Sequence, residues 1–405
     1  MPAISKGKSP FYPGQPVPLE LFVGRKDQIE RIMSRGVMQV AQGKPIAIYV
    51  QGEYGIGKSS LAGFVQALAE KEYGLHGIYA SLGGVTDLTE LAVAVMEATI
   101  HSGAVAPSRS EKIRNWLAKY IGKPEFFGFS YDVGALKQDA PSISTHMGML
   151  GFLGEARNRL ADTGVNGIFL VLDEINGISA NPQFAYFIKG LVDTNAMSKR
   201  PVPLLVMLCG VEERRREMIR HHPPVDRLFD VIDTEPLNLS ETREFFARAL
   251  ESVQIKVEPQ ALDVLVRYSA GFPKIMHLIG DAVYWTDEDG VINEGDALHA
   301  TLLAAQEVGQ KYVDQQVYRA LRSRDYHSIL KKIAQASPNE MRFTKAAVAS
   351  GLTDSEKKKF NNFLQRMKRL NVIRAGDVQG EYVFNHRMVR LYIWLNSIRK
   401  APPTA

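Results

Sequence analysis

Gly52-Glu53-Tyr54-Gly55-Ile56-Gly57-Lys58-Ser59 is the stretch of sequence that decides the expected fold. It has the form Gly-x-x-x-x-Gly-Lys-Ser, whose glycines let the backbone wrap around a phosphate with several N–H groups pointing inward. The apolar, β-branched run Ile46–Val50 before it is typical of a buried parallel strand. Leu61–Tyr73 after it has helical apolar spacing, so the positive end of that helix faces the same phosphate. Strand, loop and helix together predict a nucleotide site.

Each part of this loop has an expected role. Lys58 would reach the β- and γ-phosphates, and the Ser59 hydroxyl would ligate Mg²⁺. The sequence therefore predicts ATP and Mg²⁺ as cofactors. The predicted nucleotide contacts in this loop are Gly52, Glu53, Tyr54, Gly55, Ile56, Gly57, Lys58, Ser59 and Ser60.

The bulk composition is that of a soluble globular protein. The chain has 405 residues, enough for two or three domains, with 45% hydrophobic and 23% charged residues. A single cysteine, Cys209, excludes an intrachain disulfide and a cysteine-based metal cluster, and it fits a reducing cytoplasm. The first residues lack the apolar segment of a signal peptide, and no apolar run reaches the length of a membrane span. We therefore expect a cytoplasmic protein with no membrane partner.

Strands and helices alternate through the first 240 residues. This alternation predicts a parallel sheet with helices on both faces, an α/β fold. An inserted hairpin is expected at residues 126–133. After the strand that precedes the phosphate loop, the further strands expected are Gly77–Leu82, Gly167–Leu172, Pro203–Gly210 and Val231–Thr234.

Two acids, Asp173 and Glu174, end the strand that begins at Gly167. We expect this strand beside the phosphate-loop strand, which turns both carboxylates toward the nucleotide crevice. Asp173 would hold Mg²⁺, directly or through water, and Glu174 would polarise the attacking water. The alternative is a strand end whose acids only cap the next helix.

The strands stop at Ser240, and two further units are expected. Helices alone fill the first, whereas the second has the order helix, short helix, turn at Gly351, longer basic helix and hairpin, typical of a winged helix-turn-helix. The predicted organisation is an extended arm (1–20), a P-loop ATPase α/β domain (21–238), a helical lid domain (239–315) and a winged-helix domain (316–400).

Positive charge gathers at the C-terminal end. From Lys311 to Lys400 there are 19 Lys and Arg against 7 Asp and Glu, which favours duplex DNA as a partner. The alternative is a winged helix used for packing or protein contact, whose lysines keep it soluble. The cations of the expected recognition helix are Lys357, Lys358, Lys359, Arg366, Lys368 and Arg369, and its candidates for base contacts are Asn361, Asn362 and Gln365.

Two other cations are candidates for the nucleotide. Arg227, just before the fifth strand, could deliver a positive charge to the γ-phosphate of a neighbouring subunit; the alternative is a salt bridge to Asp226 or Asp230. Lys274, in Gly271-Phe272-Pro273-Lys274, could reach the phosphates; the alternative is a glycine C-cap, a first-turn proline and a solvated lysine.

With these residues in place, the chain resembles AAA+ and STAND-type P-loop ATPases over nearly its whole length. The nearest resemblance is to the archaeal-type ATPases, and beyond them to origin-recognition and transposition-regulator ATPases. Gly52–Ser59 is similar to Walker A and Ile168–Glu174 to Walker B. The resemblance implies that Gly24 and Arg25, in the box Phe22–Arg25, help frame the adenine. It also implies an arginine finger at Arg227, a sensor-2 role for Lys274, and a homo-oligomer.

One departure concerns Cys209, which stands where these ATPases carry a polar sensor-1 residue that helps place the attacking water. Lys274 in place of the commoner arginine is a milder departure. We interpret the sequence as a Mg²⁺-dependent ATPase whose nucleotide state controls assembly on DNA. The alternative is a slow ATP–ADP switch that regulates a protein partner, with the winged helix as an intramolecular clamp. A third interpretation is a nucleotide-stabilised scaffold without hydrolysis.

Overall fold

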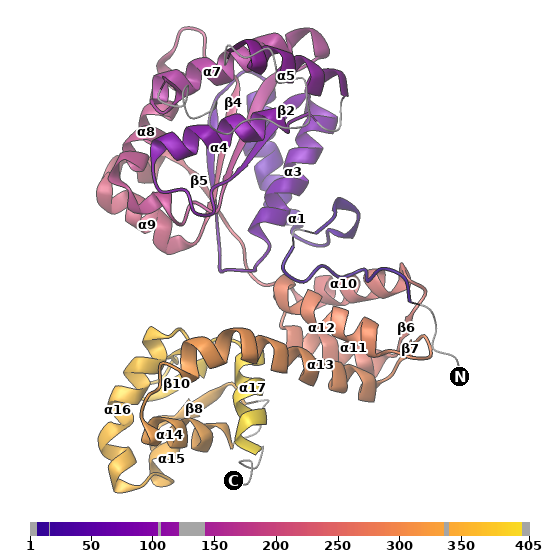
Figure 1. Ribbon diagram of the computed structural model, residues 1–405, viewed down its shortest axis with the longest axis vertical. Coiled ribbons are helices and arrows are strands. Elements are labelled where there is room, and N and C mark those ends of the chain that lie inside the picture. Colours follow the sequence, from indigo (N-terminus) through magenta and orange to yellow (C-terminus); the bar gives the residue numbers. More distant parts are fainter. Residues whose placement is uncertain (1–5, 16, 104–106, 121–141, 336–339, 399–405) are drawn as a thin grey trace. The chain divides into compact units, whose positions relative to one another are not determined.

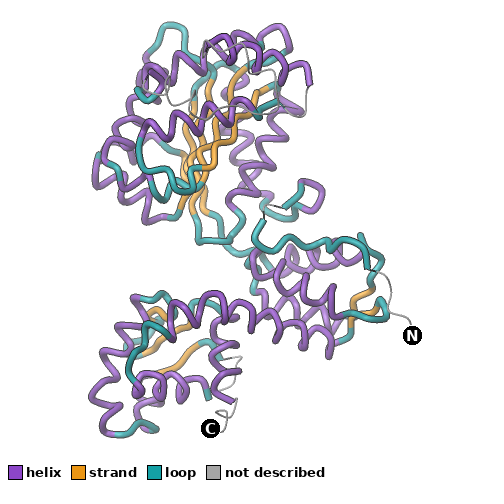
Figure 2. Tube along the Cα trace, viewed as in Figure 1, coloured by secondary structure: helices purple, strands orange, loops and turns teal. Residues whose placement is uncertain are grey.

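The computed structural model describes residues 6–15, 17–103, 107–120, 142–335 and 340–398. The chain divides into two compact units. Residues 16–235 form the core unit, and residues 1–15 together with 236–405 form the C-terminal unit (Figure 1). Figure 2 shows that the core unit is a sheet flanked by helices, whereas the C-terminal unit is mainly helical. Among the described residues, no helix combines the length and apolarity needed to cross a membrane.

Five parallel strands form the sheet of the core unit, in the order β2-β3-β4-β1-β5. Every residue of β3 and β4 is buried, as expected for central strands covered on both faces. The predicted parallel sheet is thus confirmed. The bounds are β1 Ile46–Gln51, β2 Leu75–Ser81, β3 Gly167–Asp173, β4 Leu204–Gly210 and β5 Asp230–Asp233.

The lateral order corrects one expectation. The strand that ends in Asp173 does not lie beside the phosphate-loop strand, because β4 pairs with both β1 and β3 and separates them. The succession of strands in a sequence gives their number but not their neighbours across a sheet, and this is why the expectation was wrong. Asp173 still lies at the same carboxyl edge as the phosphate loop, since all five strands are parallel.

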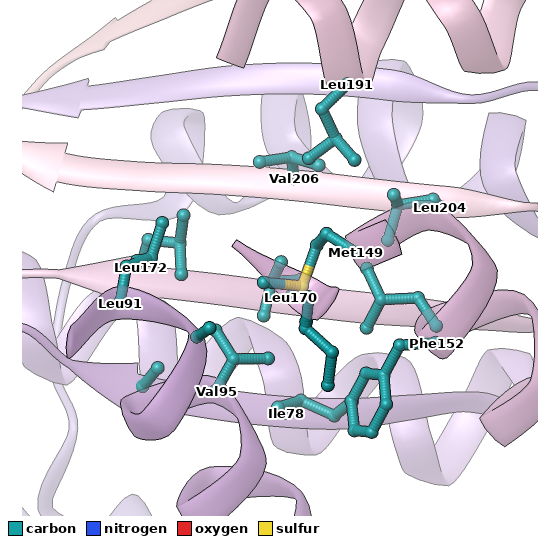
Figure 3. Packing of buried hydrophobic residues seen from close by; sticks show 14 of the residues in the cluster. Ile78, Leu91, Val95, Met149, Phe152, Leu170, Leu172, Leu191, Leu204 and Val206 are labelled. Atoms are coloured by element: carbon teal, nitrogen blue, oxygen red, sulfur yellow. The ribbon is translucent and has the colours of Figure 1, made fainter. Parts of the chain in front are cut away.

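Helices cover both faces of this sheet. One face packs against α3 and the segment from α1 to α2, with Ile32, Val37 and Leu61 fully buried. The other packs against α4, α5, α7 and α8, and Figure 3 shows Met149 and Phe152 of α7 among side chains of three strands. The predicted hairpin at 126–133 lies outside the described residues. The helices are η1 Leu19–Leu21, α1 Lys26–Ile32, η2 Met33–Val37, α2 Met38–Ala41, α3 Lys58–Tyr73, α4 Leu88–Ile100, α5 Pro107–Tyr120, α7 His146–Arg159, η4 Ala161–Thr163, η5 Ile178–Ala180, α8 Pro182–Met197, α9 Glu212–His221 and η6 Pro223–Leu228.

The C-terminal unit begins with a helical bundle. The sequence predicts helices alone between Ser240 and the winged-helix unit, and this is wrong, because Lys256–Val257 (β6) and Val291–Ile292 (β7) pair in parallel. Two-residue strands are too short for side-chain alternation to reveal them. The helices of the bundle are α10 Leu239–Glu251, α11 Pro259–Ser269, α12 Pro273–Thr286 and α13 Glu294–Val308, followed by the π-helical segment η7 Gly309–Tyr318.

The N-terminal segment packs on this bundle. Phe11 is buried against Phe245 and His277, and the Tyr12 N–H donates to Nδ1 of His277 at 3.1 Å. Lys6 pairs with the buried Asp287 at 3.3 Å. Residues 6–12 therefore belong to the bundle by their contacts, and the segment expected as one extended arm, 1–20, is divided between the two units.

A second group of elements follows the bundle. α14 is followed by a strand, a short helix, a longer helix, two strands and a last helix. The first strand, β8, was not predicted, and it pairs antiparallel with β10 at the edge of a three-stranded sheet. The bounds are α14 Arg324–Ala334, β8 Arg342–Thr344, α15 Lys345–Ser350, α16 Asp354–Arg369, β9 Ile373–Ala375, β10 Glu381–Phe384 and α17 Arg387–Ile398.

Candidate nucleotide-binding site

The phosphate loop joins β1 to α3 and depends on its glycines. Gly55 and Gly57 have φ of 78° and 93°, in the left-handed region that favours glycine. A β-carbon on Gly52 would lie 2.6 Å from the Thr234 carbonyl oxygen, so this position also excludes a side chain. The loop therefore has the conformation that a backbone cradle for phosphate requires.

Lys58 is the first residue of α3 and folds back over the loop. Its Nζ donates to the carbonyl oxygens of Gly52 and Glu53, both at 2.9 Å. Burial lowers the pKa of Lys58, and the carboxylates of Asp173 and Glu174 act against this effect. Tyr54 is 66% exposed, and its ring centroid lies 5.7 Å from Lys58 Nζ. The ammonium group is thus held at the loop by neutral acceptors that a charged phosphate could replace.

Asp173 is buried at the end of β3, and both of its carboxylate oxygens accept hydrogen bonds. Oδ2 accepts from the Tyr79 hydroxyl at 2.6 Å, and Oδ1 accepts from the Glu174 N–H at 2.9 Å. The Tyr79 hydroxyl also lies 3.5 Å from the Ser59 carbonyl oxygen. Burial and the nearby Asp173 raise the pKa of Tyr79, so the hydroxyl keeps its proton. The Tyr79 hydroxyl therefore orients Asp173 and lies near the backbone of Ser59, the other predicted metal ligand.

Sequence reasoning missed Tyr79. It lies on β2, which pairs with β3 so that Tyr79 is opposite Val171, two residues before Asp173. An isolated tyrosine in an apolar strand gives no sign of this contact, because the contact depends on which strands are neighbours.

Glu174 follows Asp173 with a φ of 57°, which is unusual for a residue other than glycine. Its side chain is exposed, and it lies against Gly83 in the segment after β2. A β-carbon on Gly83 would come within 2.5 Å of Glu174 Oε2. The alternative that these acids only cap a helix has no support, because Asn181 supplies the N-cap of α8, the next helix of the α type.

Cys209 is fully buried near the end of β4, the strand between β1 and β3. Burial raises the pKa of its thiol well above the usual value, so the group is neutral. Its carbonyl oxygen accepts from the Ile175 N–H at 3.4 Å, which ties β4 to the segment after Asp173. The position therefore carries a weak S–H donor where a polar side chain is expected.

Arg25 donates a hydrogen bond to the backbone of the phosphate loop. It is buried with a φ of 65°, next to Gly24 with a φ of 75°. One guanidinium nitrogen donates to the Ile56 carbonyl oxygen at 2.7 Å, and another donates to the carbonyl oxygen of Glu235. Ser60, at the other side of the loop, accepts from the Val17 N–H at 3.3 Å. The structure therefore gives Arg25 backbone partners at the loop.

Arg227 lies in η6 and is exposed. Its predicted salt bridges do not form, because Asp226 pairs with Arg215 at 2.6 Å and Asp230 pairs with Arg31. Within the described ranges, the Arg227 side chain has no ion pair or hydrogen bond. The alternative of a local salt bridge is thus wrong.

The neighbouring arginines, by contrast, are engaged. Arg214 pairs with Glu217, and Arg216 pairs with Glu212. Arg215 donates to Gln51 Oε1 at 3.0 Å, at the last residue of β1. Sequence reasoning did not connect Arg215 with this strand end.

Lys274 is the second residue of α12 and belongs to the C-terminal unit, whereas the phosphate loop belongs to the core unit. Gly271, before it, has a φ of 72°, and a β-carbon there would come within 2.0 Å of the Leu237 carbonyl oxygen. Ala270, not Gly271, is the C-cap of α11. The glycine of this motif is therefore required by close backbone contact.

Comparison with known proteins shows the fold. No protein-family model matches the sequence, and no curated protein sequence matches it. The structure is similar to a Walker-type ATPase of Pyrococcus abyssi, with a TM-score of 0.55 and 14% identity over 92% of this chain and 96% of that chain. It is also similar to the ORC2 protein of Aeropyrum pernix in ADPNP–ADP complexes, with a TM-score of 0.51 and 14% identity over 96% and 97%. The chain has the fold of P-loop ATPases.

Proposed function

We propose that this protein binds ATP at the Gly52–Ser59 loop, hydrolyses it with Mg²⁺, and uses its nucleotide state to control assembly on duplex DNA. The observation that carries the proposal is the pairing of a glycine-dependent loop with Lys58 Nζ, which lies 2.9 Å from two loop carbonyl oxygens. Incoming phosphate oxygens would replace these neutral acceptors with charged ones, which form stronger hydrogen bonds.

The donor set suits Mg²⁺. Hard oxygen ligands are what this ion prefers, and it is usually held by one or two protein side chains together with substrate phosphates. The Ser59 hydroxyl and the Asp173 carboxylate would hold it, with the Tyr79 hydroxyl orienting Asp173 at 2.6 Å. When bound, the ion would neutralise charge that develops on the phosphate oxygens.

Hydrolysis would rest on Glu174 and on a second subunit. Glu174 is exposed at the carboxyl edge of the sheet, where its carboxylate would polarise the attacking water and accept its proton. Arg227 is exposed and has no acidic partner among the described residues, so it would be available to the γ-phosphate of a neighbouring copy. A homo-oligomer is therefore part of the proposal. Lys274, in the C-terminal unit, is a further candidate for contact with the ATP phosphates.

Duplex DNA is the proposed partner of the C-terminal unit. The support is the winged helix-turn-helix order of its last elements and the surplus of Lys and Arg between Lys311 and Lys400. Exposed cations on α16 would exchange condensed counterions for contacts with DNA phosphates.

Cys209 favours a second candidate. A buried neutral thiol is a poor group for placing a water molecule, so hydrolysis would be slow. The protein would then be an ATP–ADP switch that acts on a protein partner, with the winged helix as a clamp within the chain. Both candidate functions use the same ATP site, but they differ in the rate of turnover and in whether the protein binds DNA.

ATP turnover, with and without duplex DNA, together with the mass of the protein in each nucleotide state, separates these functions. We expect Mg²⁺-dependent turnover that changes on addition of DNA, and a larger mass with ATP than with ADP. Slow turnover that does not change when DNA is added, together with the same mass in the ATP and ADP states, supports the switch. Absence of ATP binding contradicts both.

A further inference from the structure

A concave basic surface lies on one flank of α16, remote from the phosphate loop in sequence. It encloses a volume of about 870 Å³. The segment that precedes α14 forms one wall and α16 forms the other. We call it the arginine cleft, and its lining residues are Arg319, Ala320, Arg322, Ser323, Tyr326, Lys359, Asn362, Gln365, Arg366 and Arg369.

The charges of the arginine cleft are unbalanced. No Asp or Glu lines it, and of its five cations only Lys359 is paired, with Asp325 at 2.6 Å. The four arginines are exposed and make no ion pair with any residue that the structure describes. Among the neighbouring elements, Arg342 pairs with both Asp377 and Glu381.

The opposite flank of α16 is different. Lys357 lies 3.9 Å from Asp354, and Lys368 Nζ lies 5.1 Å from the ring centroid of Tyr382 in β10. Asn362, Arg366 and Arg369 are three or four residues apart and share one face of the helix. Lys357 and Asn361 are four residues apart, and Lys368 follows seven residues, or about two turns, later, so these three share another face. The expected recognition helix thus has two distinct polar flanks.

The length of the cleft fits a polyanion better than a single phosphate. Lys359 to Arg369 spans about 15 Å along the helix, given a rise of 1.5 Å per residue. Each DNA strand carries one phosphate for about every 3.4 Å of helix axis, so this span matches several phosphates. Guanidinium groups bind phosphate through two parallel hydrogen bonds, and Asn and Gln amides pair with base edges.

We propose that the arginine cleft, and not the Lys357–Lys368 flank, is the surface of α16 that binds the duplex. This inference rests on the proposed DNA function and specifies its surface. Arg319, Arg322, Arg366 and Arg369 contact the phosphate backbone, while Asn362 and Gln365 face the bases. Arg319 and Arg322 precede α14, so a sequence analysis limited to the recognition helix does not include them.

Two triple variants of the full chain test this surface with equal loss of charge. One is Arg319→Ala/Arg322→Ala/Arg366→Ala, and the matched control is Lys331→Ala/Lys357→Ala/Lys368→Ala, whose three lysines do not line the cleft. A fluorescein-labelled 20-base-pair duplex is titrated at several salt concentrations by anisotropy. Each lost phosphate contact makes the log–log slope shallower by about 0.9. We expect a change of about 2.7 for the cleft variant and less than about 1 for the control.

The outcomes separate this proposal from the DNA function itself. Equal losses in the two variants, or a larger loss in the control, would overturn the cleft while leaving DNA binding intact. A wild-type protein that binds no duplex at low salt would overturn the DNA function and the cleft with it. Melting temperatures check that both variants fold.

Single amide variants test the base contacts of the cleft. Asn362→Ala or Gln365→Ala should reduce discrimination between duplexes of different sequence, whereas Asn361→Ala, on the other flank, should not. A loss of discrimination confined to Asn361→Ala would contradict the assignment. The salt slope should stay unchanged in all three variants, since none removes a charge.

Discussion

The phosphate loop and the arginine cleft are both basic sites, but they hold their charges in opposite ways. At the loop Lys58 donates to two backbone carbonyl oxygens, and Arg25 donates to the Ile56 carbonyl oxygen. In the cleft four exposed arginines have no acidic partner within the described residues. The cations at the loop are held by hydrogen bonds before any ligand binds, whereas the arginines of the cleft are not held in place by ion pairs in the part of the chain that the structure describes.

This difference predicts how each site responds to change. A preorganised, partly buried site loses its function when one atom is displaced, because no neighbouring group replaces it. A solvated cluster loses affinity in small steps and responds to salt, since each cation acts on condensed counterions. Mutations in the core unit should therefore have large effects with little salt dependence, and mutations in the cleft should show the reverse.

Lys58→Ala should have the largest effect, because it removes the ammonium group that lies over the loop. We expect ATP binding to be lost in calorimetry, whereas Lys71→Ala, at an exposed position of the same helix, should bind normally. Unchanged ATP affinity in Lys58→Ala would mean that the loop does not bind phosphate.

Arg227→Ala should lower turnover by about 10³-fold or more if the arginine acts on a neighbouring subunit, while ATP binding persists. Arg216→Ala is the control, since Arg216 already pairs with Glu212. Mixing Arg227→Ala subunits with Glu174→Gln subunits should restore part of the activity. Failure to complement at every ratio argues against an arginine that acts between subunits.

Glu174→Gln should keep ATP and Mg²⁺ bound and reduce turnover by roughly 10²–10⁴-fold, because an amide has the shape of the carboxylate but accepts no proton. Turnover and nucleotide affinity are measured on the same preparation. Normal turnover would exclude Glu174 as the base, and weaker ATP binding would indicate a structural or metal-related role instead.

Tyr79→Phe should have the smallest of these effects, since it removes one hydrogen bond to Asp173. A hydrogen bond to a charged group contributes about 1.5–3 kcal/mol, so the Mg²⁺ concentration for half-maximal turnover should rise by roughly ten- to a hundredfold. Tyr49→Phe is the matched control, because that buried hydroxyl donates to the Val211 carbonyl oxygen at 3.2 Å. Equal Mg²⁺ responses of the two variants would remove Tyr79 from the site.

Much of the core could be predicted from the sequence because its signals are local. The strand before Gly52, the helix after it and the acids at 173 and 174 can each be recognised from a short segment of sequence. The position of β4 between β1 and β3 was not predictable, since no single segment carries information about its neighbours across the sheet. The Tyr79–Asp173 hydrogen bond depends on that same lateral order.

The C-terminal unit was harder to predict for a different reason. Its missed strands β6, β7 and β8 have two or three residues each, too few for a periodic pattern. Charge counting located the basic region but not its geometry. The division of α16 into two flanks, and the addition of Arg319 and Arg322 to one of them, require the packing of α14 against α16.

The central claim is that nucleotide state controls binding to DNA, and one measurement addresses it directly. The affinity of the Glu174→Gln variant for a labelled duplex is measured at fixed salt, once with ATP and once with ADP. We predict at least a tenfold difference between the two states, because the variant holds ATP without converting it. Equal affinity in both states, with ATP binding verified by calorimetry, would contradict the claim.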